Sequence, residues 1–267
     1  MSRTLALGRK ARSRVALGLL AFTLGCGCSP DGEGALRYRG AMVTIPAGEG
    51  LVGDLTGAGR QDERPARTLR FARSFAVSKH EVTNADYAEF VAATGRAAPS
   101  HWTDGKCPDA LRTHAVTHVT WDDAQTYCKW AGVRLLTEAE WEYVARGNTR
   151  WSWPWGDQFL DQMANVRFDA SVRQTPVGSN PKGCSVFGVE DLAGGVWEWV
   201  ADAYDEERWA RVSDGAIADA RTEGEGRVLK GGAWTLAPEL SRIAARDRTN
   251  ADAKGLMIGF RVARDVD

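Results

Sequence analysis

The sequence has 267 residues, of which 43% are hydrophobic and 26% are charged, so it has the composition of a globular protein. Its formal net charge of −1 shows no basic excess, and nucleic acid is therefore not an expected partner. The 11 tryptophans and 29 glycines indicate loops packed around aromatic anchors, and an aromatic ligand surface is the alternative interpretation.

The first 25 residues have the form of a signal peptide. Five basic residues between positions 3 and 14 precede an apolar run over 15–25 that is too short to span a membrane comfortably. Cys26 follows a small residue at the end of this run and is the predicted lipidation site, although Leu24 lies one position nearer to the cysteine than in the usual lipoprotein pattern. Cys28 is a second candidate, and cleavage without a lipid is the alternative. We expect an exported protein of the cell envelope that meets a bacterial membrane only through its lipid anchor.

The segment after the signal peptide predicts a tether followed by one domain. Residues 26–40 are polar and rich in glycine, which is typical of a flexible tether. Loss of the signal peptide removes five positive charges and no negative ones, so the net charge falls from −1 to −6. Residues 41–267 contain no internal repeat and no sign of a boundary, and we interpret them as a single domain.

The first half of this domain predicts short strands and three helices. Residues 42–54 predict two strands around a turn, and 73–84 predict a strand that leads into a helix. Each predicted helix begins with a threonine followed three residues later by an acid, which is the capping-box arrangement. The pairs are Thr83–Asp86, Thr120–Asp123 and Thr137–Glu140, and the helices are predicted to end at Gly95, Gly132 and Gly147.

The second half shows little periodicity until short strands return over 226–234 and 258–265. The segments between Gly147 and residue 225 are rich in Gly, Pro, Asn and Trp, and such long loops usually carry function or are held by a ligand. We therefore predict an α+β fold with low regular secondary structure and long packed loops. Cys107, Cys128 and Cys184 lie in this exported domain, where three thiols predict one disulfide and one odd cysteine.

A series of motifs in chain order resembles the formylglycine-generating enzyme, or sulfatase-modifying factor, family. These motifs include GEGLVGD, HEVTNADYAEFV, LLTEAEWEYVARG, WPWGD, TPVGSNP, DLAGGVWEWVAD, LKGGAW and GFRVARD, and they span about residues 41–265. The resemblance implies a fold related to C-type lectins. It also implies an oxidase that converts a sulfatase cysteine to formylglycine with oxygen and with copper held by two cysteines.

The chain departs from this family pattern at the copper site. The two cysteines of the family follow the Gly-Gly stretch, but no cysteine occurs from Gly231 to the end, and Leu236 and Leu240 lie in that neighbourhood. Soft Cu(I) prefers thiolate ligands, so copper is not expected here. We predict a binding or assembly protein that is not an oxidase. The alternatives are a formylglycine-generating oxidase and, with less support, a relative of the iron sulfoxide synthases.

The resemblance also implies calcium sites, and calcium is the expected metal. Glu198, between two tryptophans, is expected to be a structural carboxylate paired with a metal or with backbone N–H groups. This site lacks the family's asparagine, because the chain has Gly195 there. The second site resembles Asn165, the Val166 carbonyl and Asp169.

A group of residues after the Gly-Gly stretch is the predicted ligand cleft. It consists of Trp234, Arg242, Arg246, Arg248 and Asn250. Arginine forks suit an anion or a peptide carboxylate, so a peptide or an envelope protein is the expected partner. The alternatives are ion pairing of these arginines with nearby aspartates and a core position for the tryptophan. The histidines at 101, 114 and 118, together with Cys107, are a weaker metal candidate than a framework role for these residues.

Overall fold

The computed structural model describes residues 36–166, 173–224 and 226–266, together with Met1. Residues Glu33–Asp267 form one compact unit, and the description below concerns that unit. The predicted signal peptide, Cys26 and Asp169 lie outside the described residues.

All three predicted helices form with their predicted caps. They are α1 (Asn84–Thr94), α2 (Trp121–Ala131) and α3 (Glu138–Arg146). In each case the threonine side chain accepts a hydrogen bond from the backbone N–H three residues on, and the acid at that position accepts from the backbone N–H of the threonine. Gly95 and Gly132 end α1 and α2 in the left-handed conformation that glycine adopts without strain.

The strands of the described residues form three sheets. The strands are β1 (Met42–Ile45), β2 (Gly48–Val52), β3 (Arg67–Phe71), β4 (Phe75–Ser78), β5 (Trp197–Ala203), β6 (Arg227–Lys230), β7 (Arg246–Thr249), β8 (Ile258–Gly259) and β9 (Ala263–Asp265). Their order is β1-β4-β9 in one sheet, β2-β3 in a second and β7-β6-β5-β8 in a third. The two strands predicted over 42–54 therefore form but pair with different partners. The WEWVADA segment is β5, an inner strand that is buried along nearly its whole length.

Short helical elements complete the chain between these strands. They are η1 (Gln61–Glu63), η2 (Asp109–Leu111), η3 (Asp161–Met163), η4 (Pro181–Gly183), α4 (Arg208–Arg211) and η5 (Pro238–Ser241). The mixture of few helices, short strands and long loops is the α+β arrangement that the sequence predicts.

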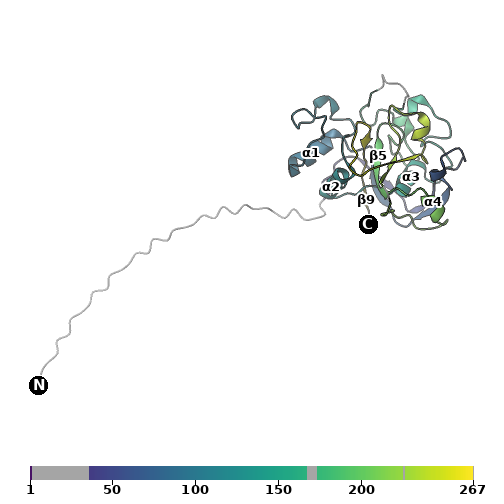
Figure 1. Cartoon of the computed structure of the whole chain (residues 1–267), viewed down its shortest axis with the longest axis horizontal. Helices are drawn as coiled ribbons and strands as arrows, with labels where there is room; N and C mark the ends of the chain where they lie inside the picture. Colours follow the sequence, from purple (N-terminus) through teal and green to yellow (C-terminus); the bar gives the residue numbers. More distant parts are fainter. Residues whose placement is uncertain (2–35, 167–172, 225, 267) are drawn as a thin grey trace. The chain divides into compact units, whose positions relative to one another are not determined.

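Two hydrophobic clusters form most of the core. In Figure 1, α1 and α2 lie on one side of β5 and α3 lies on the other. The cluster around α3 includes Trp141 and Trp209, and the cluster around α1 and α2 includes Tyr87, Tyr127 and Trp199. The three tryptophans are at most 1% exposed, which supports the interpretation of these aromatic residues as core anchors.

The compact unit begins before residue 41. The backbone N–H groups of Arg37 and Tyr38 both donate to the carbonyl of Ala131 at the end of α2, and Tyr38 is buried. The last residues of the predicted tether are therefore part of the domain. Among the described residues, no helix is both long enough and apolar enough to cross a membrane.

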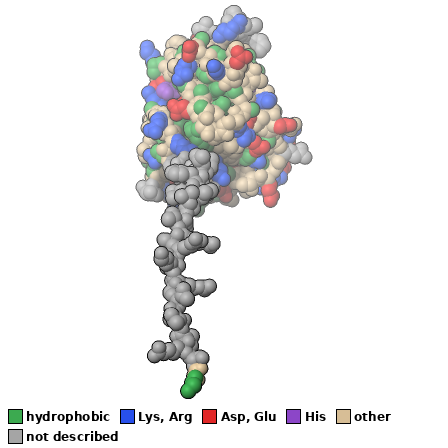
Figure 2. Space-filling model, turned by 90° about the vertical axis from the view of Figure 1, so that its left-hand side faces the viewer, with side chains coloured by type: hydrophobic (Ala, Val, Ile, Leu, Met, Phe, Trp, Pro, Cys, Tyr) green, Lys and Arg blue, Asp and Glu red, His purple; other side chains and the backbone are tan. Residues whose placement is uncertain are grey.

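Acidic and basic side chains are interspersed on the surface of the domain, as the face in Figure 2 shows. Many of them form surface ion pairs, such as Arg96 with Asp123 and Arg211 with Asp205. Such pairs contribute little to stability because water and salt screen them. Buried charged groups lie next to the candidate sites, and removing one partner of such a pair is costly because the other charge stays desolvated.

Candidate functional site

The five residues of the predicted ligand cleft do not line one cavity. Trp234 is 3% exposed and packs in a small apolar cluster with Ala115 and Val196, so it is a core residue. Asn250 is exposed directly after β7, where its carbonyl accepts a hydrogen bond from the backbone N–H of Ala253. The predicted cleft is therefore corrected, because its aromatic member lies inside the protein.

Two of the predicted arginines form ion pairs with acids from distant segments. Arg242 binds Glu63 of η1 through both terminal nitrogens, at 2.9 and 3.1 Å. Arg246, which is 1% exposed, donates to Glu138 at 2.8 Å and to the carbonyl of Asp62 at 3.0 Å. The alternative of ion pairing is correct for both residues, but their partners are not the neighbouring aspartates.

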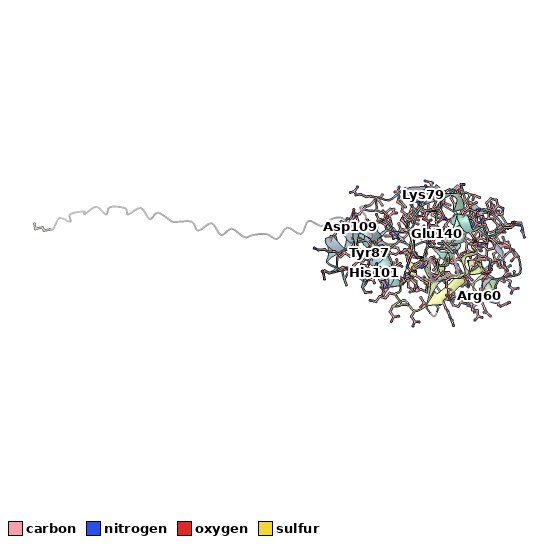
Figure 3. All side chains as sticks on the ribbon, turned by 90° about the horizontal axis from the view of Figure 1, so that it is seen from above. Arg60, Lys79, Tyr87, His101, Asp109 and Glu140 are labelled. Carbon is pink, nitrogen blue, oxygen red and sulfur yellow. The ribbon has the colours of Figure 1, made fainter. Side chains whose placement is uncertain are left out.

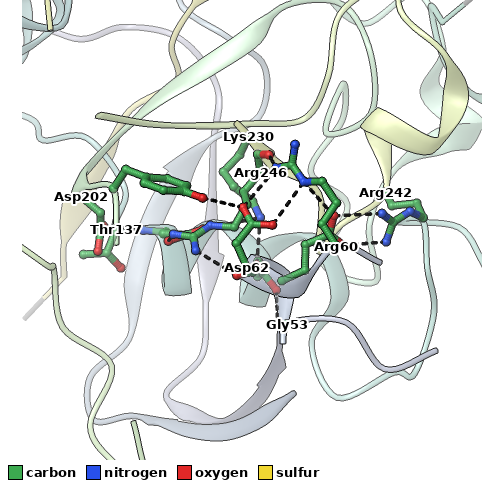
Figure 4. Close-up of polar contacts among 12 residues, drawn as sticks. Gly53, Arg60, Asp62, Thr137, Asp202, Lys230, Arg242 and Arg246 are labelled. Carbon is green, nitrogen blue, oxygen red and sulfur yellow. Dashed lines mark hydrogen bonds and ion pairs between the residues drawn. The ribbon is translucent and has the colours of Figure 1, made fainter. Parts of the chain in front are cut away.

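A buried network of charges extends from Arg246 under η1 (Figure 4). Glu138 lies 3.9 Å from the ammonium of Lys230, which donates to Glu142 at 2.8 Å. The other oxygen of Glu142 accepts from the backbone N–H of Gly53 at 2.7 Å. Burial opposes the charge of Arg246, but the acidic groups around it, chiefly Glu138 and then Asp62, together outweigh this effect and raise the pKa of the guanidinium. The network is connected to η1 by the hydrogen bond from Arg246 to the carbonyl of Asp62.

A cavity with a volume of about 350 Å³, which we call the Tyr204 cavity, lies beside η1 and β7. It is lined by two arginines, one tyrosine, one glutamine and three acids: Arg60, Arg248, Tyr204, Gln61, Asp62, Glu206 and Asp247. Its volume falls in the range of small-ligand sites. Its described lining presents guanidinium, carboxylate and phenol groups.

Tyr204 is held between two guanidinium groups in this cavity. Arg246 and Arg248 are two residues apart on β7 and therefore share one face of the strand. Their guanidinium carbons lie 4.7 and 5.1 Å from the centre of the tyrosine ring. The phenol donates to Asp62 at 2.8 Å, and burial together with this hydrogen bond raises the pKa of Tyr204 to about 12. These contacts hold the Tyr204 ring in place as one wall of the cavity. Arg248 is exposed, so its guanidinium can donate hydrogen bonds to a ligand.

Sequence reasoning missed Arg60, Asp62 and Tyr204. Arg60 is half exposed and pairs with Asp62 at 3.2 Å, and its Nη2 also donates to the carbonyl of Arg246. These residues precede the Gly-Gly stretch by 27 to 171 positions. No local pattern relates them to β7, and only the folded chain brings them beside Arg248.

Asn165 of the predicted second metal site lines a different, acidic pocket, which we call the Glu81 pocket. It is lined by Asn165, Glu81, Asp191 and Gly195, among others. Glu81 is 2% exposed, and its Oε2 has no hydrogen-bond partner among the described residues. Burial and the neighbouring charge of Asp191 hold the pKa of Glu81 well above its usual range. Val166 is buried, and its side chain is part of an apolar cluster.

Gly195 lies directly beside the carboxyl of Glu81. It has a φ of +66°, and an added Cβ would lie 2.9 Å from Oε1 of Glu81. The asparagine expected from the family resemblance would therefore need this carboxyl to move. The pocket is consequently carboxylate-rich where the family pattern predicts an amide oxygen.

Glu198 is a structural carboxylate whose partner is an arginine. Its Oε1 and Oε2 accept hydrogen bonds from Nη2 and Nε of Arg261, both at 2.7 Å, and Oε2 also accepts from the indole N–H of Trp141 at 2.8 Å. Glu198 and Arg261 are each 1% exposed. The predicted metal or backbone partner is corrected, because the guanidinium occupies both oxygens of the carboxylate.

The three later cysteines are free thiols, so the predicted disulfide is not present in this structure. Cys128 lies in α2 inside the hydrophobic core, and burial raises the pKa of its thiol. Cys107 and Cys184 are partly exposed on two other segments. No group of three or more His, Cys, Asp or Glu side chains that could hold a metal occurs in the described parts of the chain.

The histidine candidates are only partly brought together. The rings of His101 and His118 lie 4.5 Å apart, and burial lowers the pKa of His101 to about 4. In Figure 3, His101 lies toward one end of the domain and Arg60 toward the other. The histidine pair is therefore separate from the Tyr204 cavity.

Similarity to known proteins covers nearly the whole compact unit. Residues 33–266 match the family described as Sulfatase-modifying factor enzyme 1-like domain. The chain is 32% identical to the formylglycine-generating enzyme of Streptomyces coelicolor, over 86% of this chain and 91% of that protein. It is also 32% identical to hercynine oxygenase of Mycolicibacterium smegmatis, over 89% of this chain and 64% of that protein.

Two solved structures also match most of this chain. PvdO from Pseudomonas aeruginosa matches with a TM-score of 0.72 and 30% identity, covering 84% of this chain and 94% of that chain. Treponema denticola variable protein 1 matches with a TM-score of 0.70 and 21% identity, over 84% of this chain and 95% of that chain, and this likeness concerns the fold alone. On the match over residues 33–266 and these relatives, the chain belongs to the sulfatase-modifying factor enzyme 1-like family.

Proposed function

We propose that this family member is an exported binding or assembly protein and not a copper-dependent oxidase of protein cysteines. The observation that carries the proposal is the absence of any cysteine from Gly231 to the end of the chain. Leu236 and Leu240 lie in the neighbourhood where the family resemblance implies thiolates, and both pack against the α1–α2 cluster. Cys128 is a poor substitute ligand, because a buried thiol with a raised pKa stays protonated. The names of the relatives support the oxidase reading as the alternative.

The Tyr204 cavity is the proposed binding site, and a polar peptide segment of an envelope protein is the proposed ligand. The cavity offers an exposed guanidinium at Arg248, the aromatic wall of Tyr204, and the carboxylates of Glu206 and Asp247. A site with both charge signs suits a peptide, which presents carboxylate and ammonium groups as well as backbone amides. Arginine supplies the fork for a carboxylate.

Replacing Arg248 by alanine is expected to weaken peptide binding about ten- to hundredfold, since a hydrogen-bonded charge contributes roughly 1.5–3 kcal/mol. The probe is a fluorescent dodecapeptide selected against the full chain from a random display library, with affinity measured by anisotropy. Arg73→Ala is the matched control, because Arg73 is an exposed arginine on the loop between β3 and β4. Equal affinity of the Arg248→Ala variant, or failure of the library to yield a binder, would count against this ligand class.

We propose that the metal is calcium and that it binds in the Glu81 pocket. Hard Ca²⁺ takes six to eight oxygen ligands, and the unpartnered Oε2 of buried Glu81 beside Asp191 and Asn165 fits this donor set. The Val166 carbonyl and Asp169 are further candidates from the family resemblance. The cation would neutralise the carboxylates of Glu81 and Asp191, whose pKa values burial raises. Glu198 is not included in this proposal.

Millimolar CaCl₂ is expected to raise the melting temperature of the full chain relative to a sample in EGTA, because a ligand of the native state stabilises it. Glu81→Gln is expected to remove most of this shift. Glu207→Gln, at an exposed position that pairs with Arg211, serves as the control. An unchanged calcium shift in the Glu81→Gln variant would exclude this site.

Export and lipid anchoring are proposed from the first 26 residues alone. The basic start, the short apolar run and Cys26 support them. In bacterial cells, labelled palmitate is expected to enter the protein, and Cys26→Ser is expected to abolish both the label and membrane fractionation, while Cys28→Ser retains them. Labelling that persists in Cys26→Ser would assign the lipid to another residue.

A further inference from the structure

A second arginine-lined cavity borders the loop that leads into η1. This cavity, which we call the Arg146 cavity, is lined by Asp54, Arg146, Arg150, Trp151 and Arg242, among others. Its enclosed space is about 10 Å³, which is room for about one water molecule or one small ion. Neither the sequence motifs nor the proposed peptide site uses it.

Arg146 supplies a buried donor that nothing in the described chain satisfies. It is the last residue of α3 and is 1% exposed. Its Nη1 donates to the carbonyl of Gly53 at 3.0 Å, but its Nε has no hydrogen-bond partner among the described residues. A buried charged donor without an acceptor is costly, because it has lost its hydrogen bonds to water. An acceptor in the cavity would remove this cost.

The other charges of the cavity leave an excess of positive charge. Arg242 is neutralised by its two hydrogen bonds to Glu63. The carboxylate of Asp54 accepts from the backbone N–H and hydroxyl of Thr56 and from the backbone N–H of Gly59, so its oxygens are engaged by local donors. Its charge offsets that of one arginine, and the other remains uncompensated.

Arg150 provides a second available donor at the mouth of the cavity. It is exposed, and no hydrogen bond or ion pair engages its guanidinium within the described chain. Burial lowers the pKa of Arg146, the charges of Glu142 and Asp54 oppose this effect, and the like charges of Arg242 and Arg150 add to it, so the three guanidinium groups repel one another. Such repulsion is relieved when an anion lies between them.

We propose that the Arg146 cavity binds a small singly charged anion between Nε of Arg146 and the guanidinium of Arg150. The enclosed space fits a halide ion or one oxygen of a carboxylate and is too small for a phosphate group. The anion is therefore either free chloride or the carboxylate of a peptide whose remainder lies outside. The proposal is independent of the Tyr204 cavity and of calcium.

The test uses the purified full chain and the line width of the ³⁵Cl resonance of sodium chloride. Bound chloride broadens this line, and the excess width is expected to saturate with protein sites. Arg150→Gln is expected to lower the affinity about tenfold, since it removes an exposed charged donor without touching the core. Arg73→Gln, at an exposed arginine elsewhere, should leave the excess width unchanged.

Competition separates the two sources of the anion. Displacement of chloride by sodium acetate at equal ionic strength would identify carboxylates as ligands, whereas chloride binding that acetate does not displace would identify a halide site. Arg146→Lys provides a second variant, since lysine retains the positive charge but lacks the Nε donor, and it should also weaken binding. An excess width that is absent, or that is the same in Arg150→Gln as in the unaltered protein, would overturn the proposal.

Discussion

Replacing Arg261 by methionine is expected to lower the free energy of unfolding by about 3–5 kcal/mol. The substitution leaves the carboxylate of Glu198 buried with the indole N–H of Trp141 as its one remaining side-chain partner. It also removes hydrogen bonds to the carbonyls of Ser78 and Glu190, at 3.4 and 3.1 Å. Removing one partner of a buried ion pair is costly mainly because the other charge stays desolvated.

Urea unfolding followed by circular dichroism measures this effect. Arg96→Met is the matched control, because Arg96 pairs with Asp123 at the surface, where a pair contributes about 1 kcal/mol or less. The double variant Glu198→Gln/Arg261→Met should recover part of the loss, since the neutral amide can still accept from Trp141. A loss in Arg261→Met no larger than that in Arg96→Met would show that the buried pair does not stabilise the fold as described.

The helices were predictable because their signals are local. Thr83, Thr120 and Thr137 each carry their acid partner three residues away, so the cap is complete within one turn. Glycines at the ends of α1 and α2 adopt the expected left-handed conformation. No contact with the rest of the chain is needed to recognise these elements.

Strand β5 could not be predicted in the same way. Its residues are buried on both faces, so the alternation of polar and apolar residues that marks a half-buried strand is absent. Its glutamate was expected to pair with a metal or with backbone N–H groups, because the compensating charge on Arg261 is 63 positions away. A sequence shows that a buried carboxylate needs a partner but does not show which distant residue supplies it.

The candidate site was predictable only in part. Arg248 was identified from the segment after the Gly-Gly stretch, and it does line a cavity. Arg246 instead pairs with Glu138 in the buried network, and Arg242 pairs with Glu63, which lies 179 positions earlier in the chain. The spacing of arginines along one segment does not show which of them is exposed to solvent and which forms an ion pair with a buried acid on another segment.

The central claim is that this family scaffold is present without the family's copper chemistry. Cu(I) is held by soft thiolates, and the C-terminal segment from Gly231 supplies none. The described cysteines are free and lie on three separate segments, with Cys128 inside the core. We propose that the scaffold instead binds a ligand at the Tyr204 cavity.

Aldehyde formation tests this claim most directly. The full chain, supplied with copper, a reductant and oxygen, is incubated with a cysteine-containing sulfatase peptide, and the aldehyde is detected by mass spectrometry after reaction with a hydroxylamine. The Streptomyces coelicolor relative is the positive control. The account predicts conversion by the relative and no aldehyde with this protein, and more than one equivalent of aldehyde per protein molecule would contradict it.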